Sequence, residues 1–264
     1  MITERVSPNF KVFVIEDEGG VRRLRFGRYG VDQSAVKLDD PTHIEFAYMR
    51  ALVAGLGVHI AAPRILLIGL GGGTFPRFVR AQRPDAHIDV VELDAVVAEV
   101  ARHDLGFKTD ARLALHIADG RAFIERAREY WDVIVLDAYS ADNIPMALAT
   151  RSFLEAVKKR LAPDGVVLAN LWSEHVNDVY IDMLRTYEAV FPEMHVVAPD
   201  RSDSRVVMAF PELRGMTAEA LAERARALSR AWKLRYDLGI MVTRGHKGPG
   251  ELPVGGTVLE DKAN

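Results

Sequence analysis

Short apolar runs alternate with amphipathic stretches through the middle of the chain. Runs that are apolar on both faces occur at residues 64–69, 87–93, 113–117, 131–137 and 165–172. Helix-like stretches lie between or after them, near residues 75–83, 94–104, 120–129, 147–161 and 175–190. Strands of this kind, separated by helices, are typical of a parallel sheet that is covered on both sides. The pattern therefore predicts an α/β fold with a doubly wound sheet.

The pattern differs near the N-terminus. Residues 10–17 and 21–30 flank the turn Glu18-Gly19-Gly20, which predicts a β-hairpin, and residues 34–38 fit a third strand. A helix is then expected over residues 41–56, with Pro41 at its start. The sequence thus predicts a small N-terminal β-strand region with a linking helix over residues 1–56.

The C-terminal part predicts the end of the sheet and a tail. Residues 194–199 and 204–210 are expected to pair as antiparallel strands, and a helix is expected near 217–233. From residue 244 the chain is rich in glycine and proline, which predicts an arm that is extended or partly disordered. We therefore divide the rest of the chain into a Rossmann-like domain, 57–243, and a C-terminal tail, 244–264.

Composition narrows the classes of function. The chain has 264 residues, of which 49% are hydrophobic and 27% charged, as in soluble globular proteins. It has no cysteine, so disulfides and thiolate metal sites are excluded. The net charge of -3 gives no support for binding to nucleic acid or to a membrane surface. The first ten residues lack the apolar core of a signal peptide, and we expect a cytoplasmic protein.

A glycine-rich turn follows the first strand of the predicted sheet. Gly69, Gly71, Gly72 and Gly73 lie between this strand and the next helix, at the edge where open parallel sheets bind ligands. A tight strand-to-helix turn would also explain these glycines. Thr74 takes the place of the third glycine of a dinucleotide motif. The frame Gly69-x-Gly71-x-Gly73 fits better the turn of class I methyltransferase-like folds, which bind a nucleoside sulfonium.

Three carboxylates end the next strands of the sheet. Glu92, about 20 residues past the loop, could accept both ribose hydroxyls, or it could be an ordinary surface carboxylate. Asp119 could accept from an adenine amino group, could cap the next helix, or could do both. Asp137 faces the same crevice. Together with the glycine turn, they place candidate ligand groups at four successive strand ends.

These residues resemble the spermidine synthases, a family of polyamine aminopropyltransferases. The resemblance covers about residues 10 to 172 and includes "GGGTFP", "VELDAVV", "ADGRAF", "DAYSADNIP", "GRYGVDQS" and "EFAYMRAL". It implies a homodimer with a Rossmann-like, class I methyltransferase-type fold. It also implies a nucleoside site formed by Gln33, Gly69, Gly71, Gly73, Thr74, Glu92, Asp119, Gly120 and Asp137.

The same resemblance implies an amine site, where this sequence departs from the family. Tyr48 and Asp137 would lie near the reacting amine, with Ser140 and Asp142 beside them. Thr74 replaces an aspartate of the family's glycine loop, Ser140 replaces the second aspartate of another motif, and Met49-Arg50 replaces a His-Glu pair. The nucleoside half of the site is thus kept, whereas the amine half is altered.

The chemistry of amine transfer assigns a role to each of these groups. An alkylammonium has a pKa of about 10.4, so a carboxylate must hold it and accept its proton before it can attack. We assign this role to Asp137, with the Tyr48 hydroxyl orienting the amine. A polyamine needs further carboxylates along its length, for which the candidates are Asp39, Asp40, Glu45 and Asp142.

Three hypotheses follow for the function. The first is aminopropyl transfer from decarboxylated S-adenosylmethionine to a small, putrescine-like amine. The second is methyl transfer from intact S-adenosylmethionine in the same fold, and the third is a non-catalytic nucleoside-binding homologue. The histidines at 87, 103, 116 and 175 lack metal-ligand spacing, so no metal is expected.

Overall fold

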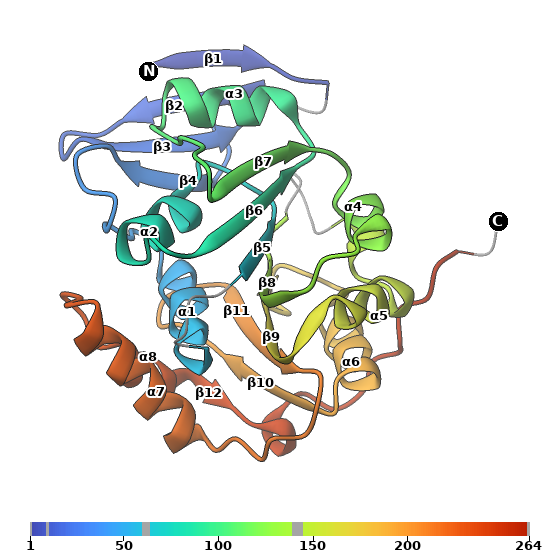
Figure 1. Cartoon of the computed structure of the whole chain (residues 1–264). Coiled ribbons are helices and arrows are strands. Elements are labelled where there is room, and N and C mark those ends of the chain that lie inside the picture. Colours follow the sequence, from blue (N-terminus) through green and yellow to red (C-terminus); the bar gives the residue numbers. More distant parts are fainter. Residues whose placement is uncertain (1, 9–10, 60–63, 139–144, 263–264) are drawn as a thin grey trace.

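The computed structural model describes residues 2–8, 11–59, 64–138 and 145–262 (Figure 1). A mixed sheet forms its centre, with the strand order β12-β10-β11-β9-β8-β5-β6-β7. The neighbours from β9 to β7 pair in parallel, and β11, β10 and β12 continue the sheet in antiparallel pairs. The strands are β5 Arg64–Ile68, β6 His87–Glu92, β7 Leu113–Ile117, β8 Trp131–Leu136, β9 Leu161–Trp172, β10 Glu193–Val197, β11 Ser204–Phe210 and β12 His246–Lys247.

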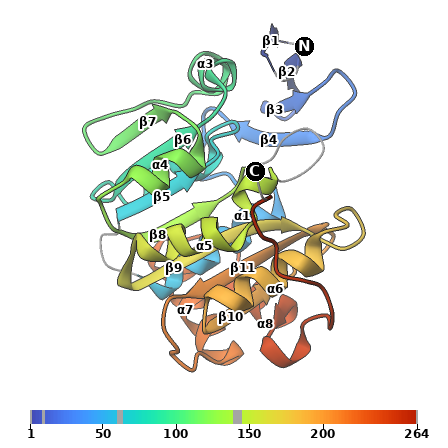
Figure 2. The same cartoon turned by 90° about the vertical axis from the view of Figure 1, so that its right-hand side faces the viewer.

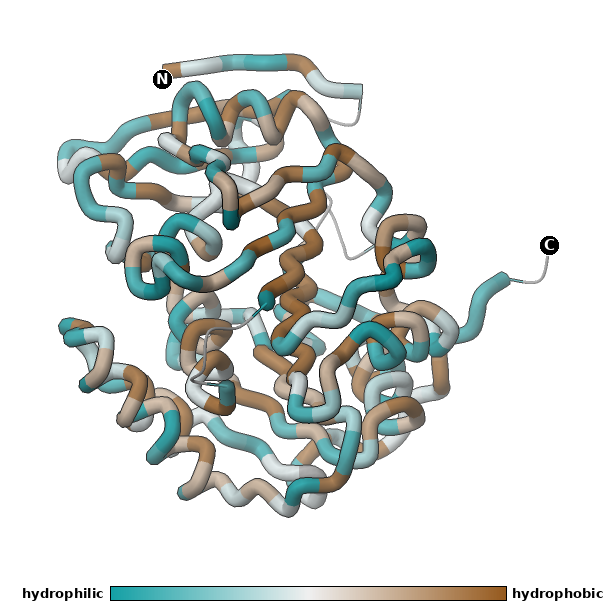
Figure 3. The backbone as a smooth tube through the Cα atoms, in the orientation of Figure 1, coloured by the Kyte–Doolittle hydropathy of each residue, from teal (hydrophilic) through white to brown (hydrophobic). Residues whose placement is uncertain are grey.

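This sheet confirms the predicted fold class, including the antiparallel pairing of its last long strands. Its two faces are covered by separate apolar cores, and hydrophobic residues are concentrated in the strands at the centre of the molecule (Figure 3). One core includes α1 Ala47–Gly55, α2 Thr74–Gln82, α3 Ala95–His103, α7 Ala218–Ala231 and α8 Leu238–Gly245. The other includes α4 Gly120–Arg126, α5 Arg151–Lys159 and α6 Tyr180–Val190 (Figure 2).

A second, antiparallel sheet lies at the N-terminal end of the chain. Its order is β1-β2-β3-β4, with β1 Thr3–Val6, β2 Lys11–Glu16, β3 Val21–Phe26 and β4 Asp32–Lys37. The predicted hairpin and third strand are confirmed as β2, β3 and β4. Strand β1 was not predicted, because four residues are too few to show an alternation of apolar and polar side chains. Apolar side chains of this sheet form a third core with Val97 and Val100 of α3.

Two helices differ from the sequence prediction. Helix α1 begins at Ala47 rather than at Pro41, because the backbone at Phe46 is extended, with ψ of 136°. The chain just before this helix forms a turn, in which the Asp40 side chain accepts from the backbone N–H of Thr42. Helix α8 was not predicted. Its first turn is capped by Asp237, which accepts from two backbone N–H groups.

The C-terminal segment runs as an extended arm along the face that carries α4, α5 and α6 (Figure 2). The backbone N–H groups of Thr257 and Leu259 donate to Asp182 and Thr186 of α6. Further along, Arg121 of α4 binds Asp261 through two hydrogen bonds of 2.7 Å. The predicted tail from residue 244 is extended only in its last part. It begins with the end of α8, strand β12 and a 3-10 helix over Pro249–Glu251, and side chains then hold the extended residues 252–262. Within the described ranges, no helix has the length and apolar character needed to cross a membrane.

Candidate functional site

The glycine turn connects β5 to α2 and packs closely against its neighbours. Gly69, Gly71 and Gly73 have φ angles of 98°, 53° and 76°, in the left-handed region. A Cβ at Gly69 would also collide with the backbone carbonyl of Asp137. Glycine is therefore needed here to let the ends of β5 and β8 approach each other. Gly69 therefore fits the explanation of a tight strand-to-helix turn. Its close approach to the Asp137 backbone also places the glycine turn beside Asp137.

Glu92 at the end of β6 holds the base of this loop. Its Oε2 accepts from the backbone N–H of Leu70, and its Oε1 accepts from that of Asp94, both at 2.9 Å. Burial raises the pKa of Glu92 above its usual range, although these N–H donors oppose the shift. A carboxylate has about four acceptor positions, so it could still accept from a diol. The structure thus gives Glu92 a role in the loop, and its contact with ribose stays a prediction.

Asp119 caps the helix that follows β7. Its Oδ1 accepts from the backbone N–H of Ala122 at 2.8 Å, which confirms the helix-cap interpretation. The next residue, Gly120, is buried, and a Cβ there would collide with Ile68 of β5. Both residues lie at the predicted edge of the sheet. A contact between Asp119 and an adenine stays a prediction.

Asp137 lies at the centre of a small polar group. The side-chain amide of Asn170 donates to its Oδ1 at 2.9 Å, and the Tyr48 hydroxyl lies 3.5 Å from its Oδ2. Burial raises the pKa of Asp137 to about 6, whereas both hydrogen bonds lower it. The pKa of Tyr48 rises well above its usual range through burial and the charge of Asp137. Asp137 can therefore change its charge near neutral pH, and Tyr48 stays a donor.

Asn170 was missed in the sequence, although a signal for it exists. It lies in the apolar run "GVVLANLW" of β9 and is 4% exposed. A polar side chain in a buried strand needs a hydrogen-bond partner, and its position on the strand next to β8 brings it to Asp137. A search for lone polar residues in predicted buried strands would have found it.

Thr74 and Gln33 lie where the glycine turn meets the small sheet. The Thr74 hydroxyl donates to the backbone carbonyl of Ala35 at 3.0 Å, and Ser34 lies 3.3 Å from it. A Cβ at Gly72 would come within 2.7 Å of the same Ser34 hydroxyl. The Thr74 side chain thus ties α2 to β4. Gln33 precedes Ser34 on β4 and is partly buried, and its nucleoside contact stays a prediction.

The carboxylates expected for a polyamine are mostly engaged elsewhere. Glu45 binds Arg23 at 2.8 Å and His43 at 2.9 Å. Asp40 accepts hydrogen bonds from Thr42, and Asp39 is exposed. Ser140 and Asp142 lie outside the described residues. Among the carboxylates expected to bind the amine, Asp137 is thus the one that the described part of the chain places beside the glycine turn.

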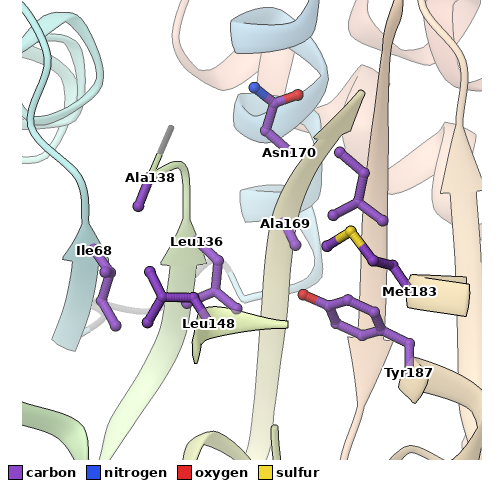
Figure 4. Close-up of a pocket in the computed structure, with 9 residues that line it drawn as sticks. Ile68, Leu136, Ala138, Leu148, Ala169, Asn170, Met183 and Tyr187 are labelled. Atoms are coloured by element: carbon purple, nitrogen blue, oxygen red, sulfur yellow. The ribbon is translucent and has the colours of Figure 1, made fainter. Parts of the chain in front are cut away.

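A small, mainly apolar hollow of about 20 Å³ lies beside this group (Figure 4). Its walls come from β5, β8, β9 and α6, from Ala138, which follows Asp137 in the chain, and from Leu148. Asn170 and Tyr187 supply its polar side chains, and burial raises the pKa of the Tyr187 phenol well above its usual range. The described lining contains no carboxylate, and the volume is enough for about one water molecule, so this hollow is too small to be a substrate site by itself.

Comparisons with known proteins show which family this chain resembles. Residues 45–199 match the spermine/spermidine synthase domain. A polyamine aminopropyltransferase of Vibrio vulnificus is 36% identical over 84% of this chain and 76% of its own length. A probable spermidine synthase of Corynebacterium glutamicum shares the fold, with a TM-score of 0.75 at 23% identity over 88% of this chain and 86% of that one. Human methyltransferase-like protein 13 in complex with SAH has a TM-score of 0.67 at 30% identity, over 73% of this chain and 95% of that one.

Proposed function

This chain belongs to the spermine/spermidine synthase family of transferases, and we propose that it moves an aminopropyl group from decarboxylated S-adenosylmethionine to an amine acceptor. The observation that carries the proposal is the Asp137 carboxylate, which lies between Asn170 and Tyr48 beside the glycine turn. A polyamine aminopropyltransferase is 36% identical to this chain, which supports the same reaction.

In this proposal the nucleoside binds across the carboxyl ends of β5, β6 and β7. Glu92 would accept from the ribose hydroxyls with its remaining acceptor positions, and Asp119 would accept from the adenine amino group. Gly69, Gly71, Gly73 and Gly120 would let the ligand approach the backbone, while Gln33 would contact it from β4. A relative that is 30% identical binds SAH, which supports an S-adenosyl ligand.

Asp137 would act on the amine. With a pKa of about 6, it is mostly a carboxylate at neutral pH and can hold the acceptor ammonium. The ammonium would first give one proton to Asp137, which frees the electron pair of the nitrogen. The nitrogen would then attack the carbon next to the sulfonium, so that the new N–C bond forms and the C–S bond breaks. The electron pair of the broken bond would stay on sulfur and leave a neutral thioether, while the product nitrogen carries the positive charge. The Tyr48 hydroxyl would orient the attacking nitrogen.

Methyl transfer from intact S-adenosylmethionine is the second candidate. Thr74 favours it, because the hydroxyl at this position is bonded to Ala35 and carries no charge that would repel the ligand's carboxylate. The structural relative in complex with SAH is a methyltransferase-like protein, which supports the same candidate. An amine acceptor beside Asp137 would serve either reaction, so the two candidates differ in the group that is transferred.

Product analysis with both donors separates these candidates. The protein is incubated with putrescine and either donor, and the amine products are identified by mass spectrometry, with Asp137→Asn as the control. A gain of one aminopropyl group from the decarboxylated donor, lost in the control, is expected. A methylated amine from the intact donor would favour the second candidate, and binding of both donors without turnover would favour a nucleoside-binding homologue.

The finer expectations from the sequence stay proposals. They are a small, putrescine-like acceptor, contacts of Ser140 and Asp142 with that acceptor, a homodimer and a cytoplasmic location. Size-exclusion chromatography with light scattering would test the homodimer, because it measures the mass of the particle in solution.

A further inference from the structure

A second hollow, of about 380 Å³, lies away from the glycine turn. It is bounded by the segment before α1, by Arg50 of α1, by Gln82 at the end of α2 and by the loop 232–236 between α7 and α8 (Figure 1). None of the glycine-turn residues, Glu92, Asp119 or Asp137 lines it. It is within the size range of small-molecule sites, so its chemistry can be considered separately.

Positive charge is in excess along this lining. It contains the side chains of Arg50, Lys233 and Arg235, against the single carboxylate of Asp40. Lys233 and Arg235 form no side-chain hydrogen bond or ion pair with a residue that the structure describes. Asp40 already accepts from the backbone N–H and the hydroxyl of Thr42. The hydrogen bond from Thr42 lowers the pKa of Asp40, and Arg235 is close enough to lower it further. The positive charge in excess that an anionic ligand would meet is therefore that of Arg50 and Lys233.

Arg50 is fixed in place at the hollow. Its Nε and Nη2 donate to the backbone carbonyl of Ile44 at 3.1 and 2.7 Å, and its guanidinium lies 4.8 Å from the ring centroid of Tyr236. The remaining Nη1 donates to no described group, so it is free to donate to a ligand. A guanidinium held by stacking loses little freedom when it binds an oxyanion.

Tyr236 contributes its ring to the lining of the hollow. Its hydroxyl is shielded from solvent and has no hydrogen-bond partner among the described residues. Burial raises the pKa of Tyr236 to about 12, so the phenol keeps its proton at neutral pH. Because water can enter the hollow but does not reach this hydroxyl, the hydroxyl faces away from the hollow.

The walls beside these donors are apolar or aromatic. Ile44, Leu234 and Trp232 line the hollow, and the Trp232 ring packs against Phe78 with a centroid distance of 5.8 Å. An indole held in this way offers a fixed surface for the planar or apolar part of a ligand. The lining therefore suits an organic anion better than an isolated inorganic one.

We propose that this hollow is a second ligand site, which binds a small phosphate monoester with a planar or apolar body. Arg50, Lys233 and Arg235 would donate to the phosphate, and Trp232 and the Tyr236 ring would contact the body. Asp40 could accept from a hydroxyl or amino group of the same ligand. The proposal does not rest on the reaction at Asp137, because it concerns different residues and is tested by binding alone.

Calorimetric titration at low salt tests the site, with phenyl phosphate, inorganic phosphate and benzoate as probes. These probes contain no nucleoside, so they avoid the Glu92 site. Phenyl phosphate is expected to bind most tightly, and added salt should weaken it because the cations are partly exposed. Failure of all three probes to bind at millimolar concentration, or equal affinity for phenyl phosphate and benzoate, would overturn the proposal.

Three variants test whether the binding is in this hollow. The double substitution Lys233→Gln with Arg235→Gln should raise the dissociation constant of phenyl phosphate about tenfold or more. Arg244→Gln removes an exposed cation of α8 outside the hollow and should leave the constant unchanged. Tyr236→Phe keeps the ring and removes a hydroxyl that does not reach the hollow, so it should also leave the constant unchanged. Equal affinities in all variants would overturn the proposal.

Discussion

The side-chain amide of Asn170 donates a hydrogen bond of 2.9 Å to Oδ1 of Asp137. The two residues come from neighbouring strands, β9 and β8, and Asn170 is almost fully buried. Burial raises the pKa of Asp137 to about 6, whereas this hydrogen bond lowers it. Because the two effects oppose each other, the charge of the proposed base depends on a residue that does not itself react.

Removing the Asn170 amide should move the acid limb of the pH–rate profile. Asn170→Ala loses a hydrogen bond to the charged form of Asp137, so the pKa of Asp137 rises and the active carboxylate forms only at higher pH. We expect the midpoint of kcat/KM to rise by about 1 pH unit, since such a bond is worth about 1.5–3 kcal/mol. Tyr48→Phe should shift it less, because its hydrogen bond is 3.5 Å long. An unchanged midpoint in Asn170→Ala would show that the amide does not tune the base.

Asp137→Asn should affect turnover far more than nucleoside binding. The amide keeps the shape of the side chain but cannot accept the proton of the amine. We expect kcat to fall about 100-fold or more, the usual contribution of general-base catalysis. Steady-state kinetics with an amine acceptor and calorimetry with the nucleoside provide the two measurements. Turnover equal to that of the unaltered protein would rule out Asp137 as the base.

The same substitution should stabilise the fold at alkaline pH. Folding raises the pKa of Asp137 from 3.8 to about 6, so the folded state favours the protonated form. This stabilisation is present at low pH and is lost as the pH rises through about 6, because the buried carboxylate then becomes charged. Asp137→Asn should therefore raise the free energy of unfolding at pH 8 by up to about 3 kcal/mol, and by less at acid pH. Denaturant unfolding at both pH values measures the difference, and a variant that is less stable at pH 8 would contradict it.

Glu92 should contribute to the nucleoside affinity and to the loop. Glu92→Ala should weaken nucleoside binding by about 2–4 kcal/mol, the range for charge-assisted hydrogen bonds and the donors that lose their partner. Glu92→Gln keeps one acceptor oxygen and the shape that supports Leu70, so its loss should be smaller. Calorimetry measures the affinities, and thermal melting separates the effect on the loop. An unchanged dissociation constant in Glu92→Ala would show that Glu92 does not bind the ribose.

Thr74 should set the preference between the two donors. We expect both sulfonium nucleosides to bind the unaltered protein within about tenfold, or 1.4 kcal/mol. Thr74→Asp should favour the decarboxylated donor, because the new carboxylate repels that of the intact one by a few kcal/mol at about 4 Å. Thr74→Val is the matched control, which loses the hydrogen bond to Ala35 without adding charge and should leave the preference unchanged. Strong exclusion of the intact donor by the unaltered protein would contradict this account.

The sequence by itself determined most of the sheet and the positions of the strand-end groups. Strand and helix periodicity is local, so residues 64–69 or 131–137 could be assigned without knowledge of their neighbours. The parallel arrangement then placed the glycine turn, Glu92, Asp119 and Asp137 at one edge, because the carboxyl ends of parallel strands lie together. The start of α1 escaped this reasoning, since the Asp40 turn competes locally with the helix.

Only the tertiary structure decided which groups share hydrogen bonds across that edge. Asn170 is 33 residues from Asp137, and Thr74 is 39 residues from Ala35. Such pairs depend on the order and register of the strands and on how two sheets pack, and neither leaves a periodic trace in the chain. The hollow around Arg50 and Tyr236 could not be predicted either, because its lining comes from segments that lie far apart in the sequence. Burial and its effect on the pKa of Asp137 likewise arise only when these distant segments exclude water together.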